Sequence, residues 1–291
     1  MQEVREIVRI SKGNSTSDGA GVRLNRAFGH EDVDLLDPFL LLDHFGSDDP
    51  DDYMAGFPMH PHRGMETITY MLKGSVEHRD STGRTGVINA GDIQWMTAGS
   101  GIMHQEMPQL SSDGVNGFQL WVNLPQAYKM MDPRYRDVRK EMIPEVVLEN
   151  GAKVKVVAGN VKGTIGPVQD LVVPVEYLDV TLGQEGSLDR EIPAEYNVFA
   201  YLFEGSAKFA EGGPFVEREH LAIFGKGDLV TVKSGLSGAR FLLVSGRPIK
   251  GSIAWGGPIV MNTEEELETA FREIRSGTFI KSGTTVRAGR K

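Results

Sequence analysis

Short β-rich runs alternate with turn residues along most of this chain, and that pattern limits the folds open to it. Four runs are rich in β-branched and aromatic residues, namely residues 67–72, 117–122, 153–157 and 239–244. Turns containing some of the chain's 35 glycines separate such runs. Closely spaced short strands with turns between them predict an all-β chain built as a sandwich or a barrel.

One helix is predicted near the C-terminus. Thr263 and Glu266 have the spacing of a capping box, and apolar residues then recur at helical spacing as far as Ile274. Gly277 is a natural stop for this helix. We expect the helix to pack on a barrel. A second, shorter helix is expected near residues 132–140.

A weak internal repeat indicates two related domains. Residues 70–75 resemble residues 201–206, and a Gly-Asp pair follows each segment, at 91–92 and at 227–228. Two β-domains of similar design explain this repeat better than one large sheet does. The predicted domains are residues 1–145 and 146–291.

The composition excludes several kinds of site. The chain has no cysteine, so any metal must be held by nitrogen and oxygen ligands. It has 31 Lys and Arg against 40 Asp and Glu, and this acidic balance argues against direct binding of nucleic acid. No segment has the apolar length of a signal peptide or a membrane span, so we expect no membrane contact. The expected location is cytoplasmic, or nuclear in a eukaryotic host.

Six of the seven histidines precede residue 105, and two pairs among them have the spacing of metal ligands. His60 and His62 would project from one face of an extended strand, and His104 and Glu106 repeat that spacing with an imidazole and a carboxylate. A single pair of this kind is more often a pair of exposed polar residues than a metal site. Two pairs on facing strands, however, would bring four ligands to one point inside a barrel. The sequence therefore predicts a metal site.

The segments around these residues resemble the pirin family of the cupin superfamily. The longest matches are residues 57–67 (FPMHPHRGMET), 91–99 (GDIQWMTAG) and 101–108 (GIMHQEMP). Shorter matches extend the resemblance over nearly the whole chain, at residues 36–39, 120–124 and 257–263. The resemblance implies two cupin (jelly-roll-like) β-barrel domains, with one metal ion in the N-terminal barrel. The implied ligands are His60, His62, His104 and Glu106.

The resemblance also implies roles for residues near the metal. It makes Fe2+ the expected ion, while ligand chemistry leaves Mn, Ni, Cu and Co open. Glu106 would be both a ligand and a catalytic base. Phe57 and Met71 are expected to bind substrate, because they lie near the His60–His62 strand and are similar to pocket positions in pirins. Gln119 is a candidate polar group that faces the substrate or a water on the metal. Glu66 is expected not to bind the metal, and either to support a ligand or to have a structural role.

Several other residues are expected to lie outside the site. Arg63 follows His62 directly, so strand alternation turns it away, either to support a ligand or to form a surface ion pair. Trp95 and Trp121 are more typical of a hydrophobic core than of a pocket. His44 and His78 are interpreted as lone, solvated loop histidines.

The repeat also predicts what the second domain offers a metal. Counting from the repeated segments places Glu191, Pro193, Arg240 and Leu242 at the four ligand positions. None of these is a histidine, and only His220 lies in this part of the chain. The C-terminal barrel is therefore expected to be free of metal.

Three function classes follow from these patterns. Three imidazoles and one carboxylate leave two open positions on an octahedral ion, which suits an oxygenase that uses dioxygen. The resemblance to pirins implies a dioxygenase that opens the ring of a flavonol such as quercetin, a small aromatic substrate. The alternative is a non-catalytic, iron-dependent regulatory protein that binds a transcription cofactor or a metabolic enzyme. A sugar or keto-acid isomerase is a third possibility, because cupins host many chemistries.

Overall fold

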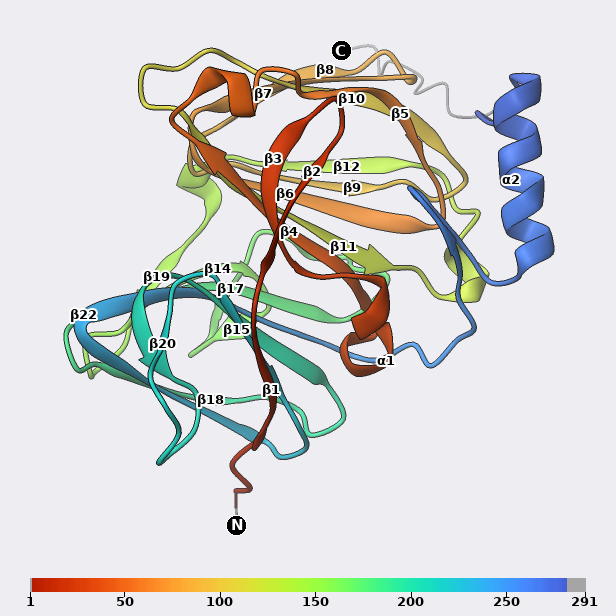
Figure 1. The fold of residues 1–291 in the computed structure, drawn as a ribbon. Coiled ribbons are helices and arrows are strands. Elements are labelled where there is room, and N and C mark those ends of the chain that lie inside the picture. The colour runs from red at the N-terminus through yellow and green to blue at the C-terminus, as the bar shows by residue number, and fades with distance from the viewer. Residues whose placement is uncertain (1, 282–291) are drawn as a thin grey trace. The chain divides into compact units, whose positions relative to one another are not determined.

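The computed structural model describes residues 2–281, which form antiparallel sheets and one helix of several turns (Figure 1). A seven-stranded sheet has the order β12-β9-β6-β11-β4-β3-β2, and a four-stranded sheet has the order β5-β10-β7-β8. The strands of these two sheets are β2 Asn14–Asp18, β3 Val22–Phe28, β4 Phe39–Ser47, β5 Phe57–His62, β6 Met65–Lys73, β7 Ser75–Asp80, β8 Thr85–Asn89, β9 Ile93–Thr97, β10 Ile102–Pro108, β11 Val115–Asn123 and β12 Arg134–Val138.

A nine-stranded sheet contains most of the remaining strands. Its order is β1-β21-β19-β22-β17-β14-β13, with β18 paired to β22 and β20 paired to β19. These strands are β1 Ile7–Lys12, β13 Glu145–Val147, β14 Lys153–Ala158, β17 Val175–Leu182, β18 Ser187–Glu191, β19 Asn197–Lys208, β20 Val216–Glu217, β21 His220–Phe224 and β22 Leu229–Gly246. Two short hairpins are β15 Asn160–Val161 with β16 Thr164–Ile165, and β23 Ala254–Gly256 with β24 Ile259–Met261.

The helical segments are few and, apart from one, short. They are α1 Val33–Leu36, α2 Glu264–Ser276 and the 3-10 turns η1 His30–Asp32, η2 Pro50–Asp52, η3 Gln126–Tyr128 and η4 Lys140–Met142. None of the helices within residues 2–281 has the length and apolar character needed to cross a membrane. The prediction of an all-β chain with a C-terminal helix is confirmed.

The prediction of a short helix near residues 132–140 is wrong. Residues 134–138 form β12, which pairs antiparallel with β9 and places Val138 opposite Ile93. Hydrogen bonding to the free edge of β9, together with burial of Val138, outweighs the weak local preference for a helix.

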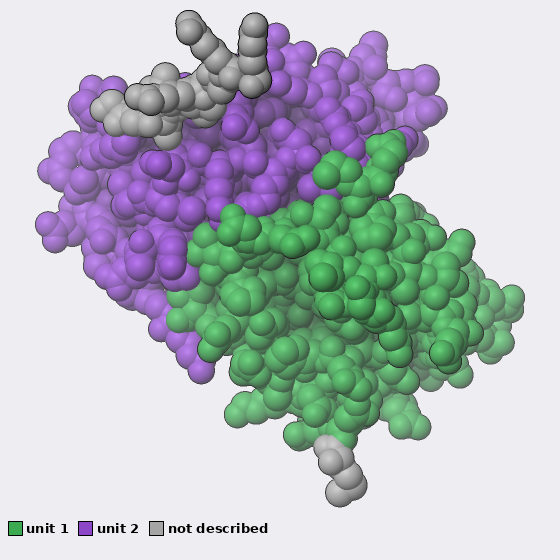
Figure 2. All heavy atoms as spheres, turned by 180° about the vertical axis from the view of Figure 1, so that it is seen from behind, with its two compact units in different colours: residues 1–14, 25–42, 141–249 green, residues 15–24, 43–140, 250–291 purple. Residues whose placement is uncertain are grey.

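The chain divides into two compact units whose segments interleave along the sequence (Figure 2). One unit contains Met1–Asn14, Asn25–Leu42 and Glu141–Ile249, and the other contains Ser15–Leu24, Asp43–Lys140 and Lys250–Lys291. This division differs from the predicted domains 1–145 and 146–291 mainly at the two ends of the chain. The N-terminal strand β1 pairs with β21, with Ile10 opposite Ala222, so it belongs with the unit formed by residues 141–249.

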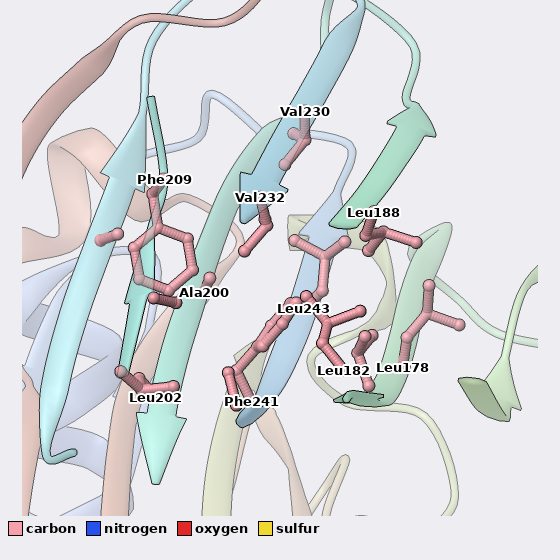
Figure 3. Packing of buried hydrophobic residues seen from close by; sticks show 14 of the residues in the cluster. Leu178, Leu182, Leu188, Ala200, Leu202, Phe209, Val230, Val232, Phe241 and Leu243 are labelled. Atoms are coloured by element: carbon pink, nitrogen blue, oxygen red, sulfur yellow. The ribbon is translucent and has the colours of Figure 1, made fainter. Parts of the chain in front are cut away.

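The nine-stranded sheet encloses an apolar interior (Figure 3). Alternate residues of β17 point inward, and Leu178 and Leu182 meet Phe241 and Leu243 from the neighbouring strand β22. The ring of Phe209 packs edge-on against Phe241, with the ring centroids 5.8 Å apart. Carbon atoms rather than polar atoms therefore fill this interior.

The helix α2 begins and ends where the sequence predicts. The Thr263 hydroxyl accepts a hydrogen bond from the backbone N–H of Glu266 at 3.2 Å, and Gly277 ends the helix with a left-handed φ of 72°. The carboxylate of Glu266 accepts from the backbone N–H of Asn262, one residue before the position that a capping box requires. Leu267 and Ala270 are buried against the β23–β24 hairpin.

Replacing Thr263 with alanine should lower the free energy of unfolding by about 1 kcal/mol, because the N–H of Glu266 then loses its side-chain acceptor. Urea denaturation measures this change. Glu268→Ala, at an exposed position inside the same helix, is the matched control and should change stability by less than about 0.5 kcal/mol. Equal effects of the two substitutions would show that the cap does not stabilise the helix.

Candidate metal centre

Strands β5 and β10 are antiparallel neighbours, and they carry the two predicted ligand pairs. His104 is directly opposite His60. Residues directly opposite one another place their side chains on the same face, and alternation adds His62 to that face. A bulge between His104 and Glu106 shifts the register, so that Glu106 lies opposite Phe57.

The three imidazoles converge on one point. The ring centroids of His60, His62 and His104 lie 4.5–5.0 Å apart. One ring nitrogen from each residue lies within 4.8 Å of the other two. The Nε2 atoms of His60 and His62 are 3.0 Å apart, so both nitrogens face the same small space. Three converging imidazole nitrogens are typical of a site for a first-row transition metal.

Burial favours the neutral form of two of these imidazoles, His62 and His104. His62 and His104 are each 1% exposed. Burial lowers the pKa of both well below the usual 6.5, and the positive charge that neighbouring imidazoles would carry lowers it further. The neutral imidazole is the form that binds a metal. The Nδ1 of His60 lies 2.8 Å from the Pro58 carbonyl oxygen, and donating a proton there leaves the lone pair of Nε2 free for a metal.

The residues present fit a bound metal ion. Neither ring nitrogen of His104 has a hydrogen-bond partner, although the side chain is buried. A buried polar group without a partner costs about 1–3 kcal/mol and is rare in native proteins. A metal ion would satisfy the lone pair that His104 presents. This nitrogen-rich cluster, in a chain without cysteine, suggests a divalent metal.

Glu106 is 3% exposed, and hydrogen bonds fix its carboxylate. Oε1 accepts a hydrogen bond from the Thr69 hydroxyl at 3.0 Å, and Oε2 accepts one from the Gln119 amide at 2.9 Å. The Gln119 carbonyl oxygen accepts in turn from the Trp121 indole N–H at 3.1 Å. The carboxylate is not part of the converging group of three imidazoles. The role of Glu106 as a fourth ligand therefore stays a prediction.

Comparisons with known proteins identify the family. The sequence model of the pirin family matches residues 21–122, and that of the pirin C-terminal cupin domain matches residues 177–280. The chain belongs to the pirin family. The predicted family is thus confirmed, and with it the two cupin domains.

Individual pirins are similar over nearly the full length. The Pirin-like protein of Caulobacter vibrioides is 44% identical, over 95% of this chain and 99% of its own. Pirin-1 of Arabidopsis thaliana is 40% identical, over 94% of this chain and 93% of its own. The crystal structure of quercetin 2,3-dioxygenase from Acinetobacter baumannii matches with a TM-score of 0.87 at 28% identity, covering 95% of this chain and 99% of that one.

The three positions expected to bind substrate lie in two places. Phe57 and Met71 belong to one hydrophobic cluster together with Tyr53 and Val76. Met71 is fully buried there, whereas Phe57 is partly exposed and lies opposite Glu106. Gln119 lies elsewhere, where it donates one of the two hydrogen bonds that hold the carboxylate of Glu106. The substrate-binding roles of these residues stay predictions.

Glu66 faces away from the imidazoles of this pirin. Thr69 of β6 contacts Glu106. Glu66 lies three residues before Thr69 on the same strand, so the two side chains point to opposite faces of that strand. The Glu66 carboxylate accepts a hydrogen bond from the Thr97 hydroxyl and lies 4.0 Å from the Arg136 guanidinium. Burial raises the pKa of Glu66. This position fits a structural role.

Two residues that we expected to lie outside the site instead border it. His78 lies in β7 rather than in a loop, is 3% exposed and is directly opposite Glu106. Trp121 was expected in the core, but it is partly exposed, and its ring lies 5.3 Å from that of His62. The alternating burial of Val76, His78 and Asp80 follows strand periodicity, but Val76 is the only apolar residue of β7, so the sequence carries no clear signal for His78.

The other expectations have mixed outcomes. Trp95 is fully buried, as predicted for a core residue. His44 is not a loop residue, because it lies in β4, where its ring packs on Phe118 with centroids 4.6 Å apart. Arg63 forms no surface ion pair, because its side chain is 2% exposed and its charged partner Glu273 lies in α2.

The second cupin domain has different chemistry at the counted positions. Glu191 and Pro193 are exposed. Arg240 forms ion pairs with Asp179 at 2.7 Å and with Glu204 at 3.1 Å. The absence of a metal from this domain stays a prediction, which the number of ions bound per chain tests.

The buried histidines predict a pH dependence of stability in the metal-free protein. The folded protein keeps His62 and His104 neutral, whereas the unfolded chain binds protons on them below pH 6.5. The free energy of unfolding should therefore fall as the pH falls below 6.5, by about 1.4 kcal/mol per pH unit for each histidine. Urea denaturation in a chelator at pH 7.5, 6.5 and 5.5 measures this. A flat profile over that range would contradict the buried, neutral cluster.

Proposed function

We propose that this chain is a metal-dependent dioxygenase that opens the heterocycle of a flavonol such as quercetin, with iron as its metal. The observation that carries the proposal is a cluster of three imidazoles, two of them buried, beside a carboxylate fixed by hydrogen bonds. The likeness of the whole chain to the quercetin 2,3-dioxygenase of Acinetobacter baumannii supports the choice of substrate class.

The metal would be held by His60, His62 and His104, with Glu106 as the nearby carboxylate. A bound divalent ion would supply Lewis acidity that acidifies a substrate hydroxyl. Glu106 would accept the proton of that hydroxyl. Its two hydrogen-bond donors, Thr69 and Gln119, are neutral, so they orient the carboxylate without neutralising its charge.

Aromatic side chains offer a surface for a flat substrate. Trp121 is partly exposed and contacts the ring of His62, and Phe57 is partly exposed opposite Glu106. Rings of this kind pack against aromatic ligands through stacked or edge-to-face contacts. The indole N–H of Trp121 donates a hydrogen bond to Gln119, and Gln119 donates one to the carboxylate of Glu106. These bonds place the indole close to the base.

The test is turnover of quercetin by the protein loaded with Fe2+. We expect consumption of dioxygen and release of carbon monoxide in proportion to the flavonol that disappears, and none in the absence of oxygen. No turnover of quercetin or related flavonols at full metal occupancy would overturn the proposal. A partner protein whose binding differs between the ferrous and ferric forms would instead favour the regulatory function, and turnover that persists without oxygen would favour an isomerase.

A further inference from the structure

The C-terminal segment, residues 259–281, contacts both strands that carry the three imidazoles. It consists of β24, the helix α2 and the residues up to Lys281, and Figure 1 shows α2 beside β5. All of these residues belong to the same compact unit as β5 and β10. The contacts lie at the end of β5 and at the start of β10, immediately next to the ligand positions.

At the end of β5, the segment surrounds Arg63, the residue after His62. The buried guanidinium forms an ion pair with Glu273 at 2.7 Å and donates a hydrogen bond to the Phe279 carbonyl oxygen at 2.8 Å. It also lies 4.2 Å above the Phe279 ring. Its third hydrogen bond goes to the Ser100 carbonyl oxygen, in the turn before β10. A charge buried to this extent is stable only with such partners.

The backbone after Arg63 is held just as closely. The backbone N–H of Val260 donates to the Arg63 carbonyl oxygen at 3.0 Å. The ammonium of Lys129 donates to the carbonyl oxygens of Gly64 and Val260, each at 2.9 Å. Gly64 has a φ of 77°, and a Cβ at this position would overlap the Val260 carbonyl oxygen. The turn that leaves His62 is therefore shaped against the C-terminal segment.

The segment also packs against the start of β10. A Cβ on Gly101 would lie 3.1 Å from the Phe279 ring, so that ring rests directly on the turn before the strand. Met103, next to His104, packs into the hydrophobic cluster that contains Phe279 and Ile274. The side chains of Met103 and His104 point to opposite faces of β10, so α2 contacts the outer side of the strand whose inner side carries the imidazole.

We propose that docking of the C-terminal segment positions His62 and His104, so that docking and metal binding stabilise each other. Arg63 acts as a positioning residue, because it holds the segment to the end of β5 and does not itself bind the metal. Coupling between two such events is reciprocal: if docking raises metal affinity by a factor, metal binding stabilises docking by the same factor. The proposal rests on the metal site proposed above and is independent of whether that site turns over a flavonol.

Hydrogen exchange of the α2 amides with and without Ni2+ tests the coupling in the full chain. Saturating Ni2+ should slow exchange in α2 by about tenfold, in the usual range for coupled sites. Strand β18, in the other compact unit, serves as the internal control and should not respond. Calorimetry run in parallel establishes that Ni2+ is bound. Bound Ni2+ with unchanged exchange in α2 would overturn the coupling, whereas no binding at all would overturn the metal site itself.

The variant Glu273→Gln tests the same coupling from the other end. It keeps the size of the side chain but removes the charge that faces Arg63. We expect about tenfold weaker Ni2+ binding and an altered absorption spectrum of the bound ion. The matched control is Glu268→Gln, at an exposed glutamate of the same helix, which should change neither. Arg63→Lys, which keeps the charge but not the three directed contacts, should behave like Glu273→Gln. Folded variants with parental affinity and spectrum would contradict the proposal.

Discussion

Replacing His104 with leucine is expected to abolish metal binding while leaving the metal-free protein at least as stable as the parent. In the parent, both ring nitrogens of His104 are buried without a hydrogen-bond partner. Leucine is of similar bulk and has no polar atom, so the substitution removes a group whose burial costs about 1–3 kcal/mol. A histidine with a purely structural role would give the opposite result, because its loss would destabilise the protein.

In the presence of metal, the variant should be less stable than the parent. At a free metal concentration 100 times the Kd, binding stabilises the parent by about 2.7 kcal/mol, and the variant should gain none of this. Urea denaturation in a chelator and in excess Ni2+ measures both states. His220→Leu, which changes an imidazole in the other compact unit, is the matched control and should respond to metal as the parent does. A His104→Leu protein that metal still stabilises would contradict the assignment.

Replacing Glu106 with glutamine should lower kcat for flavonol turnover by about 10²- to 10⁴-fold, because the amide cannot accept the substrate proton. In the parent, the Thr69 hydroxyl and the Gln119 amide both donate hydrogen bonds to the carboxylate. The new side chain at position 106 must place its NH2 group against one of these donors. The three imidazoles remain, so we expect the variant to keep its metal with reduced affinity. Steady-state kinetics at a measured metal content give kcat.

Glu66→Gln is the control for Glu106→Gln. Glu66 is equally buried, on strand β6 of the seven-stranded sheet, but its carboxylate is on the face turned away from the imidazoles. We expect this variant to be less stable than the parent, because the substitution weakens the hydrogen bond with Thr97, and to keep the parental kcat. If Glu106→Gln retained full turnover, or if both variants lost turnover equally, Glu106 would not be the base.

The features that depend on local periodicity could be predicted from the sequence. The pairs His60–His62 and His104–Glu106 share a face because strand geometry repeats every two residues, and the structure brings the imidazoles of these pairs together. The repeat of residues 70–75 at 201–206 is also structural, because Gly74 and Gly205 both adopt a φ of 74°. The helix α2 followed from its cap, its apolar spacing and its terminal glycine.

The features that depend on contacts between distant segments could not be predicted. The pairing of β1 with β21 and the placing of residues 250–281 beside β5 depend on strand edges and buried partners far along the chain. The partners of Arg63 were missed for the same reason: Glu273 and Phe279 lie more than 200 residues away. His78 was missed for a related reason: Val76 is the only apolar residue of β7, so the burial of His78 depends on its partner strand β10 rather than on a pattern in the sequence.

The amount of metal bound per chain tests the central claim most directly. Elemental analysis of the purified protein, after removal of loosely bound ions, should find one divalent metal ion per chain. The same analysis of His104→Leu should find none, because the three imidazoles form the only cluster of this kind among residues 2–281. Two ions in the parent, or one ion retained in the variant, would contradict a single site formed by His60, His62 and His104.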